Sequence, residues 1–350
     1  MHRTETAGRL NRLLLLLSAV ITLILVSGCD SSRISQQRFL QFGTIIDISL
    51  VHNDSQDIEP VFSAIEQLLS TRHLEWHGWE DGTLSRFNRA LAQQPAEGVQ
   101  IPPTLELLIS ESKKYYSLSQ GRFNPALGRL IAAWGFHDQS TADLPAIALI
   151  KQNIPGMDDL DIRNNRAFTS NPNLQLDFGA IAKGLGVSQI ARLIRQHQIK
   201  DFIINAGGDV YAEGRKPGAS WQIAIQSPFD DSVLGSIQAS SQVSIFTSGN
   251  YRRYYQDKNQ PKRHHIIDPR TGEPSTSISA ITLLHTDPVV ADVAATTLML
   301  TEPAELKQMA ATLDIQDYLA ITQQHELFIS QSMLNKIQWI EPHGLLVHIL

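Results

Sequence analysis

The segment 291–297 places an acid and a hydroxyl in an otherwise apolar stretch. Asp292 and Thr296 are four positions apart, so a helix would carry both side chains on one face. A carboxylate and a hydroxyl are oxygen ligands of the kind that a hard cation such as Mg²⁺ prefers. The alternative is structural: an Asp near a helix start interacts with the helix dipole, and a Thr can bond the carbonyl four residues back.

A second segment, 176–184, has the sequence LDFGAIAKG and predicts a strand that runs through a glycine turn into a helix. Main-chain N–H groups at a helix start attract anions, and Lys183 would add a positive charge for a phosphate. The spacing is not that of a Walker A loop. Taken alone, the pattern favours a simpler interpretation, in which Asp177 caps the helix and the lysine is solvated.

Glycine and histidine mark the remaining two segments. The Gly pair in the run NAGGD at 205–209 allows close backbone approach to a ligand, or merely forms a tight turn. The run TSGNY at 247–251 precedes RHHIIDPRTG at 263–272. A histidine pair that enters an apolar strand can place an imidazole at the mouth of a site. A surface position, or a hydrogen-bonded place in the core, is the other interpretation of such a pair.

Hydrophobic periodicity predicts the helices and strands that must hold these segments. Helices are predicted over 57–73, 102–121, 125–136 and 288–300, and a strand followed by a turn and a helix over 173–198. Strands are predicted over 38–51, 201–206, 220–227, 234–240, 242–248 and 277–286, with two helices and short strands over 303–350. This order indicates an α+β fold with mixed, mostly antiparallel sheets rather than alternating βαβ units.

Composition narrows the class of protein further. The chain has 350 residues, of which 42% are hydrophobic, so wholesale disorder is excluded. The 29 Lys and Arg against 35 Asp and Glu give a net charge of −6, and no run of five basic residues occurs, which argues against nucleic-acid binding. A single cysteine forms no internal disulfide, and no Cys/His cluster with zinc spacing is apparent in the sequence.

The amino terminus has the parts of a secretory signal. Three arginines precede the apolar run LLLLLSAVITLILV at 13–26, which is shorter than the roughly 20 residues that span a bilayer. The following LVSGC at 25–29 resembles the lipobox of bacterial lipoproteins, with Cys29 as the lipidated residue. Asp30 resembles a signal for retention in the inner membrane. The alternative is an uncleaved anchor helix with an incidental cysteine.

These features predict the organisation of the whole chain. We expect a lipoprotein signal peptide over 1–28, a lipidated polar tether over 29–37 and one catalytic domain over 38–350. The protein would then be anchored by lipid to the periplasmic side of the cell inner membrane.

Taken together, the four segments resemble FAD:protein FMN transferases of the ApbE type, which are often periplasmic lipoproteins. The resemblance runs from the Phe-Gly-Thr at 42–44 to about Leu300. Further landmarks in the order of the family are LSRFN at 84–88, GRFNP at 121–125 and Leu130 followed by WGF at 134–136. The resemblance implies an ApbE-like, T-fold-related architecture with two lobes.

The resemblance also implies which residues contact FAD. Phe42 stands where the family usually has Met, and Trp79 matches an aromatic position for which Trp76 competes. Asn124 replaces a frequent Asp, so a role that needs a carboxylate is in doubt there. The remaining contacts implied by the family pattern are Arg122, Phe123, Asp177, Lys183 and Ile267.

For the reaction, the resemblance implies Mg²⁺ held by Asp292, Thr296 and the main-chain carbonyl of Ala180. FMN would pass from FAD to a Thr or Ser hydroxyl of a target protein, and AMP would leave. His265 would accept the hydroxyl proton, and His264 would be structural. The implied acceptor is a subunit of a sodium-pumping quinone reductase or a related membrane redox complex. Alternatives are an Mg²⁺-dependent FAD pyrophosphatase and a non-catalytic, FAD-binding lipoprotein.

Overall fold

The computed structural model describes residues 32–93, 96–138, 140–230, 232–250, 254–255, 263–340 and 344–350. The predicted signal peptide and Cys29 lie outside these residues. Within the described ranges, no helix has the length and apolar character needed to cross a membrane.

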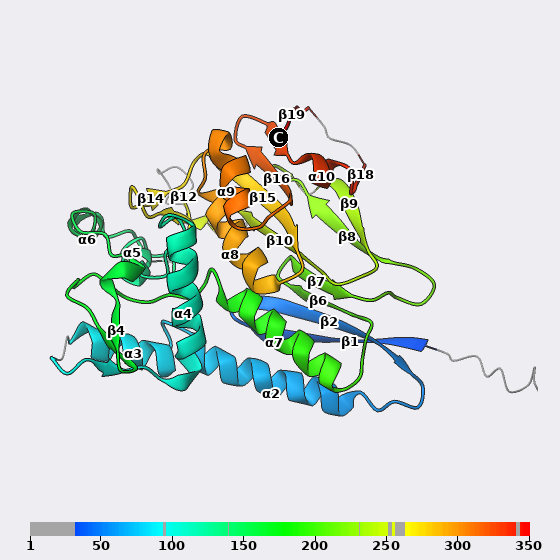
Figure 1. The fold of residues 1–350 in the computed structure, drawn as a ribbon, viewed down its shortest axis with the longest axis horizontal. Coiled ribbons are helices and arrows are strands. Elements are labelled where there is room, and N and C mark those ends of the chain that lie inside the picture. Colours follow the sequence, from blue (N-terminus) through cyan, green and yellow to red (C-terminus); the bar gives the residue numbers. More distant parts are fainter. Residues whose placement is uncertain are drawn as a thin grey trace, which may run out of the picture.

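A nine-stranded sheet forms the centre of the molecule (Figure 1). Neighbouring strands are antiparallel, except that β17 and the edge strand β19 are parallel. The predicted α+β fold with mostly antiparallel sheets is therefore confirmed. In spatial order the strands are β1 (Ser32–Gln41), β2 (Thr44–Asn53), β6 (Phe202–Ala206), β7 (Asp209–Glu213), β10 (Val243–Gly249), β15 (Ile278–His285), β16 (Asp317–Thr322), β17 (Glu326–Ile329) and β19 (Leu346–Ile349).

Both faces of this sheet are covered, because alternating side chains enter two different cores. On β10, Phe246 belongs to the larger core and Ile245 to the smaller one; Leu283 and Leu284 of β15 divide in the same way. The larger core contains side chains of the helices α2 (Glu59–Trp76), α7 (Ala182–Gln196), α8 (Pro288–Met299) and α9 (Leu306–Thr312). The smaller core lies against β8 (Trp221–Gln226), β9 (Val233–Ala239), β18 (Ile337–Trp339) and α10 (Gln331–Leu334).

A second lobe lies beside the helical face, on the left in Figure 1. It contains α3 (Thr83–Ala92), α4 (Pro103–Leu118), α5 (Gly128–Ala133), α6 (Leu144–Ile150) and the small sheet of β3 (Val99–Gln100), β5 (Arg166–Phe168) and β4 (Asp161–Arg163). The 3-10 helix Met157–Asp159 precedes β4. The two-lobed arrangement agrees with the expectation from the family pattern.

Short pieces complete the described chain. They are β11 (Tyr254–Tyr255), β12 (Arg263–His264), β13 (Ile267–Asp268), β14 (Glu273–Pro274) and the 3-10 helix Pro303–Glu305.

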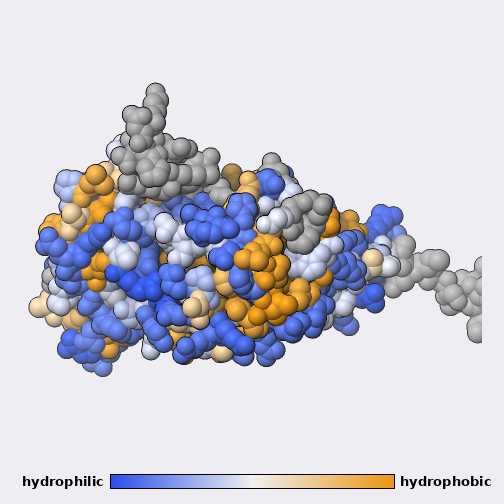
Figure 2. All heavy atoms as spheres, turned by 90° about the horizontal axis from the view of Figure 1, so that it is seen from above, coloured by the Kyte–Doolittle hydropathy of each residue, from blue (hydrophilic) through white to orange (hydrophobic). Residues whose placement is uncertain are grey.

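The surface of the molecule is mixed in character. Figure 2 shows an apolar area among polar side chains on the face seen from above. The edge strand β19 exposes three apolar side chains, Leu346, Val347 and Ile349. Nothing in the described residues indicates what would cover this edge.

Three sequence predictions about local structure are wrong. The single strand expected over 38–51 is two strands, because Phe42 and Gly43 have φ values of 54° and 65° and form a tight turn. Residues 32–37, expected as a polar tether, are the first part of β1 and pair with β2. The strand expected before α7 is reduced to an isolated bridge between Gln175 and Leu127.

Candidate active site

The most strongly charged buried place in the described structure is a cluster of Lys183, Asp209 and Asp292. The three residues come from the first turn of α7, the start of β7 and the second turn of α8. The Lys183 ammonium contacts Asp209 Oδ2 and lies 3.3 Å from Asp292 Oδ1. The two carboxylate side chains are only 7% and 5% exposed. The structure therefore brings together two residues that the sequence analysis named and one, Asp209, that it did not assign.

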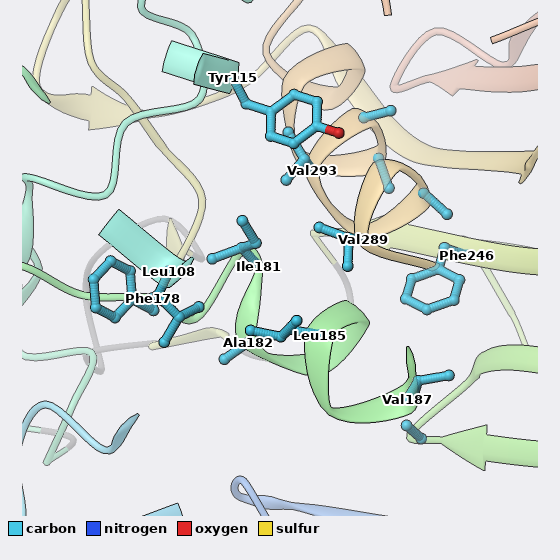
Figure 3. Close-up of a cluster of buried hydrophobic side chains, with 14 of the residues drawn as sticks. Leu108, Tyr115, Phe178, Ile181, Ala182, Leu185, Val187, Phe246, Val289 and Val293 are labelled. Atoms are coloured by element: carbon cyan, nitrogen blue, oxygen red, sulfur yellow. The ribbon is translucent and has the colours of Figure 1, made fainter. Parts of the chain in front are cut away.

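Close packing of α7 on α8 creates the cluster. Gly184 permits it, because a Cβ there would lie 2.4 Å from Pro288 O and 2.8 Å from Asp292 Cβ. The Gly184 N–H donates to Asp292 Oδ2 at 2.8 Å and fixes that carboxylate. Around the contact the helices meet through apolar side chains, among them Leu185 and Val289 (Figure 3). The charged cluster is therefore surrounded by apolar side chains of both helices.

The turn between β6 and β7 positions Asp209, the third residue of the charged cluster. Gly207 and Gly208 have φ values of 69° and 101°, and the Gly208 N–H donates to Asn205 Oδ1 at 2.8 Å. A Cβ on Gly207 would lie 2.1 Å from Thr44 Oγ1. The glycine pair therefore forms a tight turn packed against β2, which is one of the two interpretations left open by the sequence.

Charge is not balanced within the cluster. Burial opposes a charge on Lys183, yet the carboxylates of Asp209 and Asp292 raise its pKa, so the lysine stays protonated. Burial raises the pKa of Asp292, against the opposing effect of Lys183. With both acids ionised, two negative charges face one positive charge. A net charge of −1 in a buried place favours binding of a further cation.

The oxygen donors near Asp292 suit a hard cation. Thr296 lies one helical turn further along α8 and is partly exposed, and its hydroxyl forms no hydrogen bond with the described residues. Ala180 lies two positions before the start of α7 and four before Gly184, whose N–H holds Asp292. The structural alternatives apply to neighbours instead: Asp287 caps α8 by accepting from the Val289 N–H at 2.8 Å, and Thr297 donates to Val293 O at 2.9 Å.

The two competing tryptophans occupy different environments. Trp76 is 4% exposed and donates from Nε1 to Thr104 O at 3.1 Å. Trp79 is half-buried and donates from Nε1 to Asp177 Oδ2 at 3.1 Å. Asp177 also accepts from the Gly179 N–H at 2.9 Å, so it orders the turn before α7. The structure thereby joins Trp79 to the segment that carries Lys183.

Phe42 also lies close to this segment, at the turn between β1 and β2. Its ring packs against Trp76, with ring centroids 6.2 Å apart. Phe42, Thr44, Lys183 and Gly186 line a common small cavity of about 10 Å³, room for roughly one water molecule.

Three consecutive residues are predicted to contact FAD: Arg122, Phe123 and Asn124. In the structure their side chains are engaged mainly with other groups of the protein. Arg122 is 7% exposed and pairs with Glu305 at 2.5 Å. Phe123 is fully enclosed in the core, so a ligand could be contacted only by its main chain. Asn124 donates from Nδ2 to Pro155 O at 2.8 Å and accepts from the following Ala126 N–H at 3.0 Å. An Asp at position 124 could not make the first of these bonds when ionised.

The predicted histidine strand is interrupted. Residues 265 and 266 separate β12 from β13. Successive side chains here do not alternate between two faces, as they would in a continuous strand, and Ile266 and Ile267 are both buried. Ile267 packs in a small core with Trp134. His265 is half-buried. His264 is 6% exposed; its Nε2 contacts Ser275 O, and its Nδ1 accepts from the Ile266 N–H at 3.3 Å.

The sequence analysis missed a further group, His73, His77 and Glu80, whose ligand atoms lie within 4.8 Å of one another. His73 Nε2 is 3.3 Å from Glu80 Oε2, and His77 Nε2 is 3.8 Å from Oε1. However, His77 Nδ1 accepts the main-chain N–H groups of Trp79 and Glu80 at 3.3 and 3.0 Å. The proton of this neutral ring must then be on Nε2, the atom a metal would need. In the sequence, the spacing of four positions from His73 to His77 and of three from His77 to Glu80 could have indicated that these side chains lie on one side of a helix.

Comparison with known proteins gives one consistent family. A family model described as the ApbE family matches residues 42–319. An "FAD:protein FMN transferase" from Klebsiella pneumoniae (strain 342) is 30% identical over 273 residues, which are 75% of this chain and 81% of that protein. One from Rhodobacter capsulatus is 29% identical over 87% of this chain. The match spans only 58% of that longer relative.

Solved structures agree in fold. The "Flavin Transferase ApbE from Vibrio cholerae" superposes with a TM-score of 0.76 at 24% identity, covering 87% of this chain and 99% of that one. The ApbE protein from Thermotoga maritima gives 0.77 at 21% identity, covering 87% and 100%.

Proposed function

Since the chain belongs to the ApbE family, we propose that it is an FAD:protein FMN transferase, the activity for which its relatives are named. An acceptor hydroxyl oxygen would form a bond to the phosphorus of the FMN moiety. The bond from that phosphorus to the AMP moiety would break, and AMP would leave. The hydroxyl proton would pass to a base. The observation that best supports this proposal is the buried cluster of Lys183, Asp209 and Asp292, in which two carboxylates face one ammonium.

Oxygen donors of this chain fit a resident Mg²⁺. Asp292, Thr296 and the Ala180 carbonyl would hold the ion, which when bound would neutralise pyrophosphate charge in the reaction. Phosphoryl transfer needs little covalent help, so alignment and charge dominate. Lys183 brings a permanent positive charge to the same place, and the start of α7 adds main-chain N–H groups for an anion.

His265 is the proposed proton acceptor for the hydroxyl of the target Thr or Ser. Imidazole is a common general base near neutral pH, and the half-buried side chain of His265 leaves part of the ring accessible to a bound peptide. The neighbouring His264 is unsuited to this role, because main-chain groups engage both of its ring nitrogens.

Flavin contacts are proposed at the turn beside the cluster. Phe42 and Trp79 offer aromatic faces, and Asp177 holds the indole of Trp79 in place. Arg122 and Asn124, the main chain of Phe123, and Ile267 would complete the surroundings of FAD, mostly by shaping loops.

The proposed setting is the periplasmic side of the cell inner membrane, with the protein anchored by lipid on Cys29. Each buried methylene of an acyl chain contributes about 0.8 kcal/mol, so several chains give stable anchoring. A suitable acceptor is a subunit of a sodium-pumping quinone reductase or a related membrane redox complex.

The test is to mix the protein with FAD, MgCl₂ and an acceptor domain of such a complex. Mass spectrometry should find FMN bound to a Thr or Ser of the acceptor, with one AMP for each adduct. AMP without an adduct would indicate FAD hydrolysis, and FAD binding without either product would indicate a flavin-holding protein. His265→Ala should lower the transfer rate by about 10²–10⁴-fold without changing FAD affinity. A change in FAD affinity alone would exclude the role of a base.

A further inference from the structure

The ammonium of Lys183 lies between two carboxylates, of which only one belongs to the proposed metal site. Asp292 is on α8, whereas Asp209 opens β7 on the central sheet. The contact with Asp209 is the closer one, and the distance to Asp292 Oδ1 is 3.3 Å. One carboxylate is enough to neutralise one lysine, so the second requires an explanation.

Main-chain N–H groups hold both carboxylates in fixed orientations. The Thr247 N–H donates to Asp209 Oδ1 at 2.9 Å, and the Gly184 N–H donates to Asp292 Oδ2 at 2.8 Å. Each acid therefore turns its other oxygen toward Lys183. The oxygen of Asp292 that faces the lysine is also the one that its N–H partner leaves to a metal ion.

It follows that Lys183 and a divalent cation compete for Asp292 Oδ1. Like charges at one oxygen repel, and the flexible stem of a lysine can swing its ammonium to another partner. Asp209 is that partner, since its Oδ2 already contacts the ammonium. The ammonium lies closer to Asp209 Oδ2 than to Asp292 Oδ1, so the Asp209 oxygen is the less available of the two for a metal ion.

We propose that Asp209 is a positioning residue that holds the Lys183 ammonium aside, so that Asp292 Oδ1 is open to a divalent cation. This inference rests on the proposed function, in which Asp292 binds Mg²⁺. Asp209 thereby separates two positive charges, lysine and metal, while keeping both beside the substrate phosphates.

The test measures Mg²⁺ affinity by isothermal titration calorimetry with MgCl₂ alone, in the absence of FAD. Asp209→Asn leaves Asp292 as the sole ionic partner of the lysine, so the Kd for Mg²⁺ should rise by at least about threefold. Lys183→Gln removes the competitor and should lower that Kd. Asp209→Glu retains the charge and should recover part of the affinity.

The double variant Asp209→Asn/Lys183→Gln decides between two explanations. Without the lysine, the change at position 209 should alter the Kd by less than about twofold relative to Lys183→Gln. An equal weakening in both backgrounds would mean that Asp209 acts only through its charge, and would overturn the inference. An unchanged Kd for Asp209→Asn would overturn it as well.

Two controls separate this inference from the proposed function. Asp201→Asn removes a carboxylate at the far end of the β6–β7 pair, where it accepts the Arg215 N–H at 2.7 Å, and should leave the Kd unchanged. Asp292→Asn should abolish measurable Mg²⁺ binding. If it does not, the proposed metal site is wrong; if it does while Asp209→Asn has no effect, only the role of Asp209 is wrong.

Discussion

Two groups of possible metal ligands lie in this molecule, and they differ in how their neighbours orient them. In the cluster of Asp209, Asp292 and Lys183, each acid has one oxygen fixed by a main-chain N–H and the other turned into the cluster. In the group of His73, His77 and Glu80, the atoms also lie close together. There, however, the main chain occupies His77 Nδ1 and leaves the proton on Nε2.

The difference shows that proximity of ligand atoms is not sufficient for a metal site. A metal-bound imidazole normally donates its second N–H to an acceptor. His73 Nδ1 is buried without any partner within the described chain, and His77 Nδ1 faces two donors. The histidine group is therefore a hydrogen-bonded network around Glu80, whereas the acidic cluster is the place where we propose a cation site.

The largest effect is expected for Asp292→Asn. The amide keeps an acceptor for the Gly184 N–H but loses the charge, so Mg²⁺ affinity and FMN transfer should fall by more than about 100-fold. Asp287→Asn is the matched control, because Asn caps a helix as well as Asp does. Calorimetry and transfer assays compare the two variants. If Asp292→Asn transferred FMN at the normal rate in the presence of a chelator, the acidic cluster would not be a metal site, and it would not differ from the histidine group in this respect.

Gly184→Ala should have the next largest effect. Its Cβ would meet Pro288 O at 2.4 Å, so α7 and α8 must separate. Overpacking of this kind destabilises a protein by about 1–3 kcal/mol. Urea unfolding should show that loss, together with weaker Mg²⁺ binding. Gly218→Ala controls for glycine replacement without a clash, since no atom lies within 4 Å of a Cβ there, although its φ of 75° is itself unfavourable. Equal Mg²⁺ affinity in both variants would contradict the role of the close contact.

His77→Ala should change stability but not metal binding. The main-chain N–H groups of Trp79 and Glu80 would lose their acceptor, at a cost of about 1 kcal/mol in the free energy of unfolding. The affinities for Mg²⁺ and Zn²⁺ should equal those of the unaltered protein. A Zn²⁺ site lost in both His73→Ala and His77→Ala would instead show that the histidine group does bind metal.

The smallest expected effect concerns pH. Burial lowers the pKa of His264 from its ordinary value of 6.5, so the unfolded chain takes up a proton before the folded chain does. This contribution to stability is complete above pH 6.5 and is lost as the pH falls through the lower, folded pKa. The free energy of unfolding, measured with denaturant between pH 5 and 8, should decrease toward low pH, and His264→Gln should make this decrease smaller. An unchanged profile would mean that His264 is not the group that titrates.

Much of the fold could be predicted from the sequence, because apolar periodicity is a local signal. The helices at 57–73 and 288–300 and most central strands were found in this way. The turn at Phe42 was missed, since a positive φ at a residue other than glycine leaves little trace in a hydrophobic pattern. Asp209 was seen only as part of a turn, because its partners Lys183 and Asp292 are 26 and 83 positions away.

The histidine strand was mispredicted for a similar reason. Alternation predicts the faces of side chains only where a strand is continuous. At residues 265 and 266 the strand is broken, and the chain there contacts Ser275 on the facing segment, which a local pattern does not reveal. The burial of Ile267 likewise depends on a neighbour that is distant in sequence, Trp134.

The first strand has a consequence for where this protein can work. β1 contains ten residues, so at a rise of about 3.3 Å per residue it is roughly 30 Å long. It starts three positions after Cys29 and ends at the turn of Phe42, beside Lys183. If Cys29 carries a lipid as proposed, this length of chain, together with the three preceding residues, would limit the distance of the site from the bilayer surface to about 40 Å. An acceptor would then be selected by the elevation of its hydroxyl as well as by the residues around it.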